Sequence, residues 1–194
     1  MASSLDYYEQ NAGSFIASTI DADVSQLHER FLRYLPEGSL ILDFGCGSGR
    51  DTKAFLASGY ACEALDGSHR LCAYASKYTG IKVQCMDFLS FHETCRFDGI
   101  WACASLLHCQ RDKLPSLLEN LSDALKDGGV MYMSFKHGNG DREKDGRLFT
   151  DMNSALMAEI LPPTLEVLEE WISTDVRGGD LPEWLNVIAM RRHR

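Results

Sequence analysis

The stretch LILDFGCGSGRD, residues 40–51, places a short apolar run before three closely spaced glycines, Gly45, Gly47 and Gly49. Glycine allows tight backbone turns and leaves room for a ligand beside the main chain. The stretch therefore predicts a buried strand that turns directly into a helix beginning near Arg50. In an open parallel sheet the binding crevice lies at the carboxyl ends of the strands, so we expect a ligand there. A tight turn without a ligand is the alternative at this point.

The composition favours one domain over residues 1–194. Of the 194 residues, 45% are hydrophobic, which is enough for one substantial core. No stretch approaches the roughly 20 uninterrupted apolar residues of a membrane span, and the N-terminal residues lack a basic-then-apolar signal segment. We therefore expect a cytoplasmic protein without a membrane partner. The 7 cysteines are scattered without a C-x-x-C pair, so neither a disulfide framework nor a metal site is expected.

The charge disfavours nucleic acid as a partner. The chain has 19 Lys and Arg against 28 Asp and Glu, a formal net charge of −9, whereas polyanion binding relies on clustered positive charge. The chain closes on RRHR, residues 191–194, and we interpret so short a basic run as a solvated end. The sequence carries no signal for an oligomeric state.

The hydrophobic period separates helices from strands. Apolar residues recur at helical spacing in the segments 24–35, 68–80 and 114–125, with Ser68 as a cap and Gly80 as an end signal. Between these helices lie short apolar runs, which we interpret as strands buried on both faces. The runs are residues 39–44, 60–65, 81–86, 97–105 and 129–135. This alternation indicates βαβ units and a parallel sheet with helices on both sides.

The pattern changes after the last of these runs. The polar, glycine-rich segment 136–147 predicts a surface loop, and a helix is expected from about Asp151 to Ile160. Two strand-like runs follow, at residues 164–173 and 183–192. We therefore predict a single-domain, doubly wound α/β fold with a mostly parallel, seven-stranded sheet. Its last two strands form an antiparallel C-terminal pair.

Two details of the glycine loop select the kind of ligand. In the dinucleotide fingerprint G-x-G-x-x-G the third glycine stands one residue later than Gly49 does, and the position of Asp43 is normally apolar. A carboxylate close to phosphates would repel them. A ligand with an ammonium, a sulfonium and a ribose suits this loop better, which disfavours a nicotinamide oxidoreductase. Asp43 is expected both to bond backbone amides of the loop and to position that ligand.

Five segments, in the expected order, resemble a known family. LDFGCGSGRD resembles the first motif of class I S-adenosylmethionine-dependent methyltransferases, and ALDGS, CMDF, FDGIWACASLLH and LKDGGVMYMSF resemble the strand ends that follow. The details YYEQNAGSF, ASLLH and SFKHGNG resemble small bacterial tellurite-resistance methyltransferases. The resemblance implies a Rossmann-like fold, S-adenosylmethionine as cofactor and a small-molecule methyl acceptor. It also implies a helical segment over the cofactor, residues 1–37, and an α/β core, residues 38–194. Membership of the family does not determine the acceptor.

The resemblance further implies a set of cofactor-binding residues. Asp66 would accept hydrogen bonds from the ribose hydroxyls, Asp87 and Phe88 would flank the adenine, and Tyr8 lies in the segment that folds over the cofactor. For Asp87 a cap of the turn after its strand is an equal alternative, and for Tyr8 the alternative is packing in an amphipathic helix. The full set is Tyr8, Asp43, Gly45, Gly47, Ser48, Gly49, Arg50, Asp66, Gly67, Ser68, Asp87, Phe88, Ala104 and Ser105.

A second set of residues would meet the acceptor. In the family arrangement His108 faces the transferable methyl group and Lys136 ends the fifth strand on the same side, so both would position the acceptor rather than act as acid or base. For His108 the alternative is a structural residue whose hydrogen bonds are satisfied within the protein. Arg147, Phe149 and Arg177, in later loops, are candidate substrate-binding residues. Arginine can hold an oxyanion with two hydrogen bonds. We therefore expect a small anion or a soft nucleophile as acceptor, with solvated loop charges as the alternative for any single cation.

A binding protein of the same fold is the alternative function. It would sense S-adenosylmethionine or S-adenosylhomocysteine without chemistry. Room for an acceptor lined by Ser105, His108 and Lys136 would distinguish an enzyme from such a protein. Because a sulfonium methyl is already electrophilic, an enzyme needs mainly in-line positioning and exclusion of water. No pair of residues in the sequence marks a general base.

Overall fold

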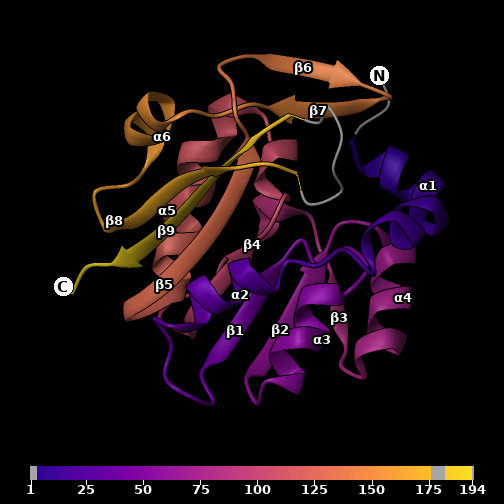
Figure 1. The fold of residues 1–194 in the computed structure, drawn as a ribbon, viewed down its shortest axis with the longest axis horizontal. Coiled ribbons are helices and arrows are strands. Elements are labelled where there is room, and N and C mark those ends of the chain that lie inside the picture. The colour runs from indigo at the N-terminus through magenta and orange to yellow at the C-terminus, as the bar shows by residue number, and fades with distance from the viewer. Residues whose placement is uncertain (1–3, 176–181, 194) are drawn as a thin grey trace.

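The computed structural model describes residues 4–175 and 182–193, whose central sheet is flanked by helices (Figure 1). In this part of the chain the sheet has 7 strands in the order β3-β2-β1-β4-β5-β9-β8. Their bounds are β1 Leu40–Phe44, β2 Ala61–Asp66, β3 Val83–Cys85, β4 Phe97–Ala102, β5 Leu125–Lys136, β8 Leu165–Ser173 and β9 Trp184–Arg191. Strands β1 to β5 are mutually parallel, whereas β9 is antiparallel to both β5 and β8. The predicted sheet and its antiparallel C-terminal pair are confirmed.

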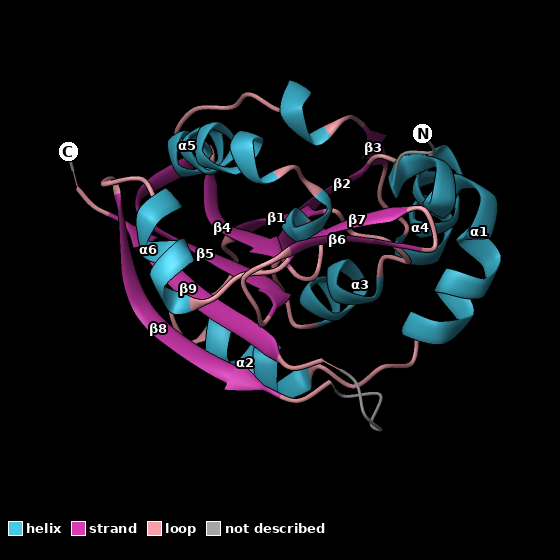
Figure 2. Cartoon of the chain, turned by 90° about the horizontal axis from the view of Figure 1, so that it is seen from above, coloured by secondary structure: helices cyan, strands magenta, loops and turns pink. Residues whose placement is uncertain are grey.

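Helices cover both faces of the sheet, as Figure 2 shows. They are α1 Ser4–Thr19, α2 Ser25–Leu32, α3 Arg50–Ala57, α4 His69–Thr79, α5 Leu114–Ala124 and α6 Ser154–Ile160, with short 3-10 helices η1 Phe88–Ser90, η2 Leu106–His108 and η3 Arg111–Lys113. Phe31 of α2 and Phe55 of α3 share a buried cluster with Ile41, whereas the leucines of α5 pack with Leu42. Neighbouring residues of a strand point to opposite faces. Helices α2 and α3 therefore cover one face of the sheet and α5 the other.

Local signals set several helix ends. The Ser68 Oγ accepts a hydrogen bond from the Leu71 N–H at 3.3 Å, and Gly80, with a φ of 82°, ends α4. Both signals were predicted. Helix α6 begins three residues later than expected, because Asn153 caps it by accepting from the Leu156 N–H at 3.0 Å. In the described residues no helix is long and apolar enough to cross a membrane.

Residues 136–147 were predicted to form a surface loop, and this prediction was wrong. Strand β6 Asp141–Lys144 pairs with β7 Arg147–Thr150 in a separate two-stranded antiparallel sheet. Asp145 and Gly146, which join the strands, have φ angles of 54° and 76°. Two successive residues with positive φ form a hairpin turn whose twist matches that of the strands. This local signal outweighs the polar composition of the segment. The hairpin packs through β7 against η2, α1 and β5.

Arg191 is not part of a solvated end, which corrects the interpretation of the basic tail. Its side chain is 1% exposed. The Nη1 group donates to the carbonyl oxygens of Ser122 at 2.8 Å, Asp123 at 2.7 Å and Leu125 at 2.5 Å. The last carbonyls of a helix lack partners within the helix, so Arg191 helps to satisfy the end of α5. It thereby joins β9 to α5.

Candidate functional site

Two adjoining cavities lie at the carboxyl edge of the sheet, beside the point between β1 and β4 where the strand order reverses. The larger cavity, about 530 Å³, is lined by the ends of β1, β2 and β3 and by α1. The smaller cavity, about 370 Å³, is lined by the start of α3, the end of β5 and the β6–β7 hairpin. The residues common to both linings are Tyr8, Phe15, Gly45, Gly47, Ala104 and His108.

The glycine loop forms part of the shared wall. Gly45, Gly47 and Gly49 all have positive φ angles, of 83°, 55° and 79°. A Cβ atom on Gly45 would lie 2.4 Å from the Ser105 Cβ and 2.9 Å from the Phe88 Cζ, so no larger residue fits there. The loop leads from β1 into α3, which begins at Arg50. The predicted strand, turn and helix are therefore confirmed.

Asp66, at the end of β2, lines the larger cavity and holds the glycine loop. Its carboxylate accepts from the Gly47 N–H at 2.9 Å and from the Ser68 N–H at 2.9 Å. Burial raises its pKa, against the hydrogen bonds that lower it. Asp87 caps η1 by accepting from the Leu89 N–H at 2.8 Å, and it also lines the larger cavity beside Phe88. The cap is thus confirmed for Asp87, and its contact with the adenine stays a prediction.

Three residues of the expected cofactor set line neither cavity. The Asp43 carboxylate is turned towards α3, where it accepts from the Thr52 N–H at 3.0 Å and from the Thr52 Oγ1 at 2.5 Å. Gly49 is the residue before α3 and lies against α4, and Ser68 caps α4. Each of these residues is committed to a helix start, and their contact with the ligand stays a prediction. Burial, reinforced by the negative charge of Asp51, raises the pKa of Asp43.

The remaining members of the expected cofactor set lie where a ligand would reach them. Gly67 and Ser105 line the larger cavity, and Ser48 and Arg50 the smaller. The Ser105 Oγ is buried and has no hydrogen-bond partner among the described residues. Ala104 adopts a φ of 53°, which is a strained conformation for a residue with a side chain. Such a buried hydroxyl and such backbone strain are typical of a binding site.

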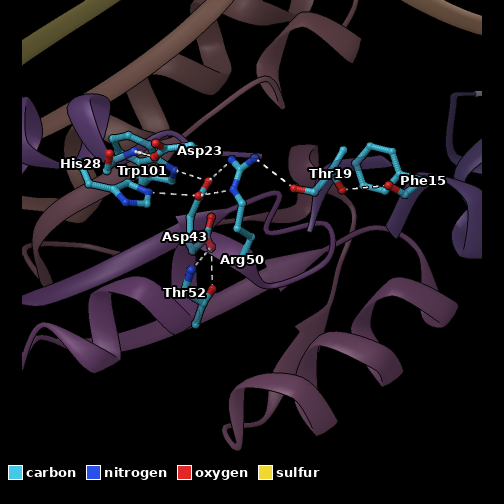
Figure 3. Close-up of polar contacts among 10 residues, drawn as sticks. Phe15, Thr19, Asp23, His28, Asp43, Arg50, Thr52 and Trp101 are labelled. Atoms are coloured by element: carbon cyan, nitrogen blue, oxygen red, sulfur yellow. Dashed lines mark hydrogen bonds and ion pairs between the residues drawn. The ribbon is translucent and has the colours of Figure 1, made fainter. Parts of the chain in front are cut away.

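A buried polar network joins Arg50 to residues that sequence reasoning missed (Figure 3). Asp51 accepts from the His28 Nε2 at 3.0 Å, from the Trp101 Nε1 at 2.8 Å, and from the Arg50 Nε and Nη2 at 2.8 and 2.9 Å. His28 comes from α2 and Trp101 from β4. The only signal for this network in the sequence was an acid directly after Arg50 at a helix start.

His108 and Tyr8 form a hydrogen-bonded pair in the wall between the cavities. The His108 Nδ1 lies 2.7 Å from the Leu148 carbonyl oxygen, so Nδ1 carries the proton. Its Nε2 therefore accepts from the Tyr8 hydroxyl, 2.7 Å away. Burial lowers the pKa of His108 to about 4 and raises that of Tyr8. The pair is neutral at physiological pH.

Four of the expected acceptor residues come together in the smaller cavity. His108, Lys136, Arg147 and Phe149 all line it. Ser105, expected beside them, lines the larger cavity. Arg177 lies outside the described residues. Arg142 and Lys144, which we had not included in the substrate-binding set, also line the smaller cavity.

The two central cations of the smaller cavity are held differently. The Lys136 Nζ pairs with the Asp175 carboxylate at 3.1 Å and lies 3.6 Å from the centre of the Trp184 ring. The Arg147 guanidinium lies 4.2 Å from the centre of the Tyr7 ring, and its buried Nε has no hydrogen-bond partner among the described residues. Both cations are paired, Lys136 with Asp175 and Arg147 with Asp145 at 3.4 Å, but Arg147 keeps a donor to offer at Nε.

Comparison with known proteins finds a methyltransferase domain in the chain. Residues 41–129 match a family model described as a methyltransferase domain. The match covers a little under half of the chain, and the fold is that of S-adenosylmethionine-dependent methyltransferases of known structure. No protein of curated function matches the sequence significantly. The narrower resemblance to tellurite-resistance methyltransferases stays a prediction.

Solved structures share the fold at low sequence identity. An S-adenosylmethionine-dependent methyltransferase from Mesorhizobium loti has a TM-score of 0.72 at 20% identity, covering 89% of this chain and 100% of that one. The Burkholderia thailandensis 1,6-didemethyltoxoflavin-N1-methyltransferase has a TM-score of 0.71 at 19% identity, covering 100% and 92%. The N-methyltransferase NodS from Bradyrhizobium japonicum WM9, in complex with S-adenosyl-L-homocysteine, has a TM-score of 0.71 at 18% identity, covering 95% and 98%.

Proposed function

We propose that the protein transfers the methyl group of S-adenosylmethionine to a small-molecule acceptor that is an anion or a soft nucleophile. The observation that carries this proposal is the smaller cavity, which adjoins the larger one across a shared wall and leaves room for a second molecule. Its charged lining is mostly cationic. The cations are Arg50, Lys136, Arg142, Lys144 and Arg147, and the anions are Asp51 and Asp175.

The larger cavity fits the nucleoside part of the cofactor. The Asp66 carboxylate would accept from the ribose hydroxyls, and the Asp87 carboxylate and the Phe88 ring would contact the adenine. The buried Ser105 hydroxyl has no partner among the described residues and could bond the ligand. The turned backbone at Gly45 leaves the main chain open to the ligand. When bound, S-adenosylmethionine supplies a methyl group on a sulfonium, which is already electrophilic.

Helix α1 closes this site from outside, so residues 1–37 serve in our proposal as a cover over an α/β core of residues 38–194. Tyr8 and Phe15 of α1 line both cavities. Glu9 anchors the helix by accepting from the Ser68 Oγ at 2.6 Å and from the Arg70 N–H at 3.2 Å, which lowers its pKa. A closed wall at this point keeps water from the reacting atoms.

The arrangement suits an acceptor that needs no base. The His108 Nε2 is already engaged by the Tyr8 hydroxyl, and a pKa of about 4 makes this imidazole a weak base. Its role is to hold Tyr8 in the shared wall. Arg147, with its unpaired Nε, is placed to hold an anionic group of the acceptor. Positioning then supplies most of the rate enhancement.

The comparisons support a small-molecule acceptor. The Burkholderia thailandensis structure holds 1,6-didemethyltoxoflavin together with S-adenosylhomocysteine. By analogy of fold, our chain would hold an acceptor and the cofactor in its two adjoining cavities. A binding protein without chemistry is the alternative function, and no observation favours it.

The direct test is turnover of methyl-labelled S-adenosylmethionine with a panel of small acceptors that includes thiolates, selenide, carboxylates, amines and neutral apolar molecules. We expect labelled product from soft or anionic members. Cofactor binding without turnover on any member would support the binding-protein alternative. Preference for neutral apolar acceptors would contradict the anionic part of the proposal.

Asp66 offers a test of the cofactor site. We expect Asp66→Ala to weaken S-adenosylhomocysteine binding by about 1.5 to 3 kcal/mol, the usual worth of hydrogen bonds to a charged group, and Asp66→Asn to be milder. Isothermal titration calorimetry measures both. Glu63→Gln, on the same strand but outside both cavities, is the control and should bind as the wild type does. Unchanged affinity in the alanine variant would remove Asp66 from the site.

A further inference from the structure

The Asp51 carboxylate is saturated by hydrogen-bond donors from three elements of the fold. Its Oδ1 accepts from the His28 Nε2 of α2 and the Arg50 Nε of α3, and its Oδ2 accepts from the Arg50 Nη2 and the Trp101 Nε1 of β4. His28, Trp101 and Arg50 are labelled in Figure 3, where dashed lines mark the hydrogen bonds among the residues drawn. Asp51 is 7% exposed although it lines the smaller cavity. With four donors it has little capacity left to bind a ligand itself.

The same bonds leave part of Arg50 available. A guanidinium has five N–H groups in one plane. Arg50 uses three of them, because Nε and Nη2 each donate to Asp51 and Nη1 donates to the Thr19 carbonyl oxygen at 3.3 Å. Within the described residues, one N–H on Nη1 and one on Nη2 remain without a protein partner. Arg50 lines the smaller cavity beside Gly47 and Ser48. Two N–H groups of one guanidinium match the two oxygens of a carboxylate.

The position of Arg50 relative to the nucleoside indicates which carboxylate of the ligand Arg50 would bind. The ribose and adenine candidates Asp66 and Phe88 line the larger cavity, whereas Arg50 lines the smaller one. Gly45 and Gly47 line both cavities. A cofactor whose nucleoside fills the larger cavity therefore extends its amino-acid end past Gly47 and towards Arg50.

We propose that Asp51 is a positioning residue which, together with His28 and Trp101, fixes the Arg50 guanidinium so that it binds the carboxylate of the cofactor's amino-acid end. This inference rests on the proposed function. Asp51 performs its role only as an anion. Burial acts to raise its pKa, but the charge of Arg50 and the hydrogen bonds from His28 and Arg50 outweigh burial and hold the pKa well below its usual range. Asp51 and Arg50 are therefore both charged throughout the physiological pH range.

The test compares two ligands that differ in the amino-acid end. S-Adenosylhomocysteine carries it, and 5′-methylthioadenosine keeps the nucleoside and the thioether but lacks it. We expect Arg50→Lys, which keeps the charge but loses the planar pair of donors, to lower S-adenosylhomocysteine affinity about 10- to 100-fold. Affinity for 5′-methylthioadenosine should stay within about 2-fold. Isothermal titration calorimetry measures both affinities for each variant. Their ratio, the affinity for S-adenosylhomocysteine divided by that for 5′-methylthioadenosine, is the quantity compared.

Asp51→Asn tests the positioning role itself. The amide cannot accept on its nitrogen side, so Arg50 loses one of its two bonds and its counter-charge. We expect the affinity ratio to fall about 3- to 10-fold, a smaller change than in Arg50→Lys. Trp101→Phe keeps the ring packing and removes one donor, which provides a milder variant if Asp51→Asn does not fold. Its ratio should fall about 2- to 3-fold. Arg33→Lys, on the exposed side of α2, is the matched control.

The remaining outcomes would overturn either the inference or the proposed function. Equal losses of both ligands in Arg50→Lys, or an unchanged ratio, would overturn the inference while leaving the methyltransferase proposal in place. A lowered ratio in Arg50→Lys with no change in Asp51→Asn and Trp101→Phe would overturn the positioning role. If the wild-type protein bound neither ligand, the proposed function would fail, and the inference with it.

Discussion

His108 shows how a single residue takes its state from its surroundings. Its Nδ1 proton is committed to the Leu148 carbonyl oxygen and its Nε2 to the Tyr8 hydroxyl, so the ring joins the hairpin to helix α1. Protonation would place a second donor against a hydroxyl that is already donating, in a buried site. The folded protein therefore resists protonation of His108, whereas the unfolded chain does not.

This resistance predicts a pH dependence of stability. The pKa of His108 falls from 6.5 to about 4 on folding. Because the unfolded chain takes up the proton first, the stabilisation is fully present above about pH 6.5 and is lost as the pH falls through 4. We expect the wild-type protein to lose up to about 3 kcal/mol more between pH 7 and pH 4 than His108→Gln does. Urea unfolding at both pH values measures this.

His92→Gln is the control for that comparison, because His92 is exposed. It should lose the same free energy of unfolding as the wild type between the two pH values. A wild type and a His108→Gln variant with parallel pH profiles would show that His108 is not buried as a neutral ring.

Asp43 and Asp66 mark the limit of what residue identity reveals. Each is an acid at the end of an apolar strand, and the sequence assigned both to the ligand. Asp43 turns to the start of α3 and Asp66 to the glycine loop and the larger cavity. The direction of each carboxylate depends on which backbone N–H groups the neighbouring elements present. That information is absent from the local sequence.

Among the elements, the β6–β7 hairpin contributes three of the cations that line the smaller cavity, although Arg142 pairs with Asp151 and Arg147 with Asp145. It brings Arg142, Lys144 and Arg147 to the smaller cavity, and through Leu148 it also holds His108. The hairpin forms its own two-stranded sheet, apart from the main one. Its turn therefore controls the local order of the smaller cavity more than the stability of the whole protein.

Gly146→Ala tests this separation. Gly146 has a φ of 76°, where a side chain costs about 1 kcal/mol. We expect amide hydrogen exchange to quicken about 5-fold in residues 141–150, with little change in the main sheet. Gly140→Ala is the matched control, since a Cβ there meets nothing within 4 Å. Equal exchange in the two variants would contradict a turn that depends on Gly146.

At the scale of the whole molecule, the C-terminal strand pair is joined to the parallel core through Arg191. Strand β9 pairs with the long β5, and Arg191 adds bonds to three carbonyl oxygens at the end of α5. The Ser122 oxygen also accepts from the Leu125 N–H and the Asp123 oxygen from the Cys95 N–H, so Arg191 adds a further donor to each. Arg191 thus connects the last strand to the opposite layer of the fold.

Loss of this connection should destabilise the entire protein. We expect Arg191→Met, which keeps the apolar stem, to lower the free energy of unfolding by about 3 to 5 kcal/mol, because it removes three buried hydrogen bonds donated by a charged group. Arg192→Met is the control, since Arg192 is 58% exposed, and it should stay within about 0.5 kcal/mol of the wild type. Denaturant unfolding measures the free energy of unfolding of both variants. A similar small loss in both variants would show that Arg191 has no structural role.

The sequence alone determined the parallel sheet, the glycine turn into α3, the capped helix α4 and the class of cofactor. These features depend on hydrophobic period and backbone freedom, which are properties of neighbouring residues. The Asp145–Gly146 turn was also present as a local signal, but the polar, glycine-rich composition around it predicted a loop. Only the tertiary structure decided the direction of Asp43, the tautomer of His108, the burial of Arg191 and the donors that saturate Asp51. Each of these depends on groups far apart in the chain, whose meeting follows from how the layers pack.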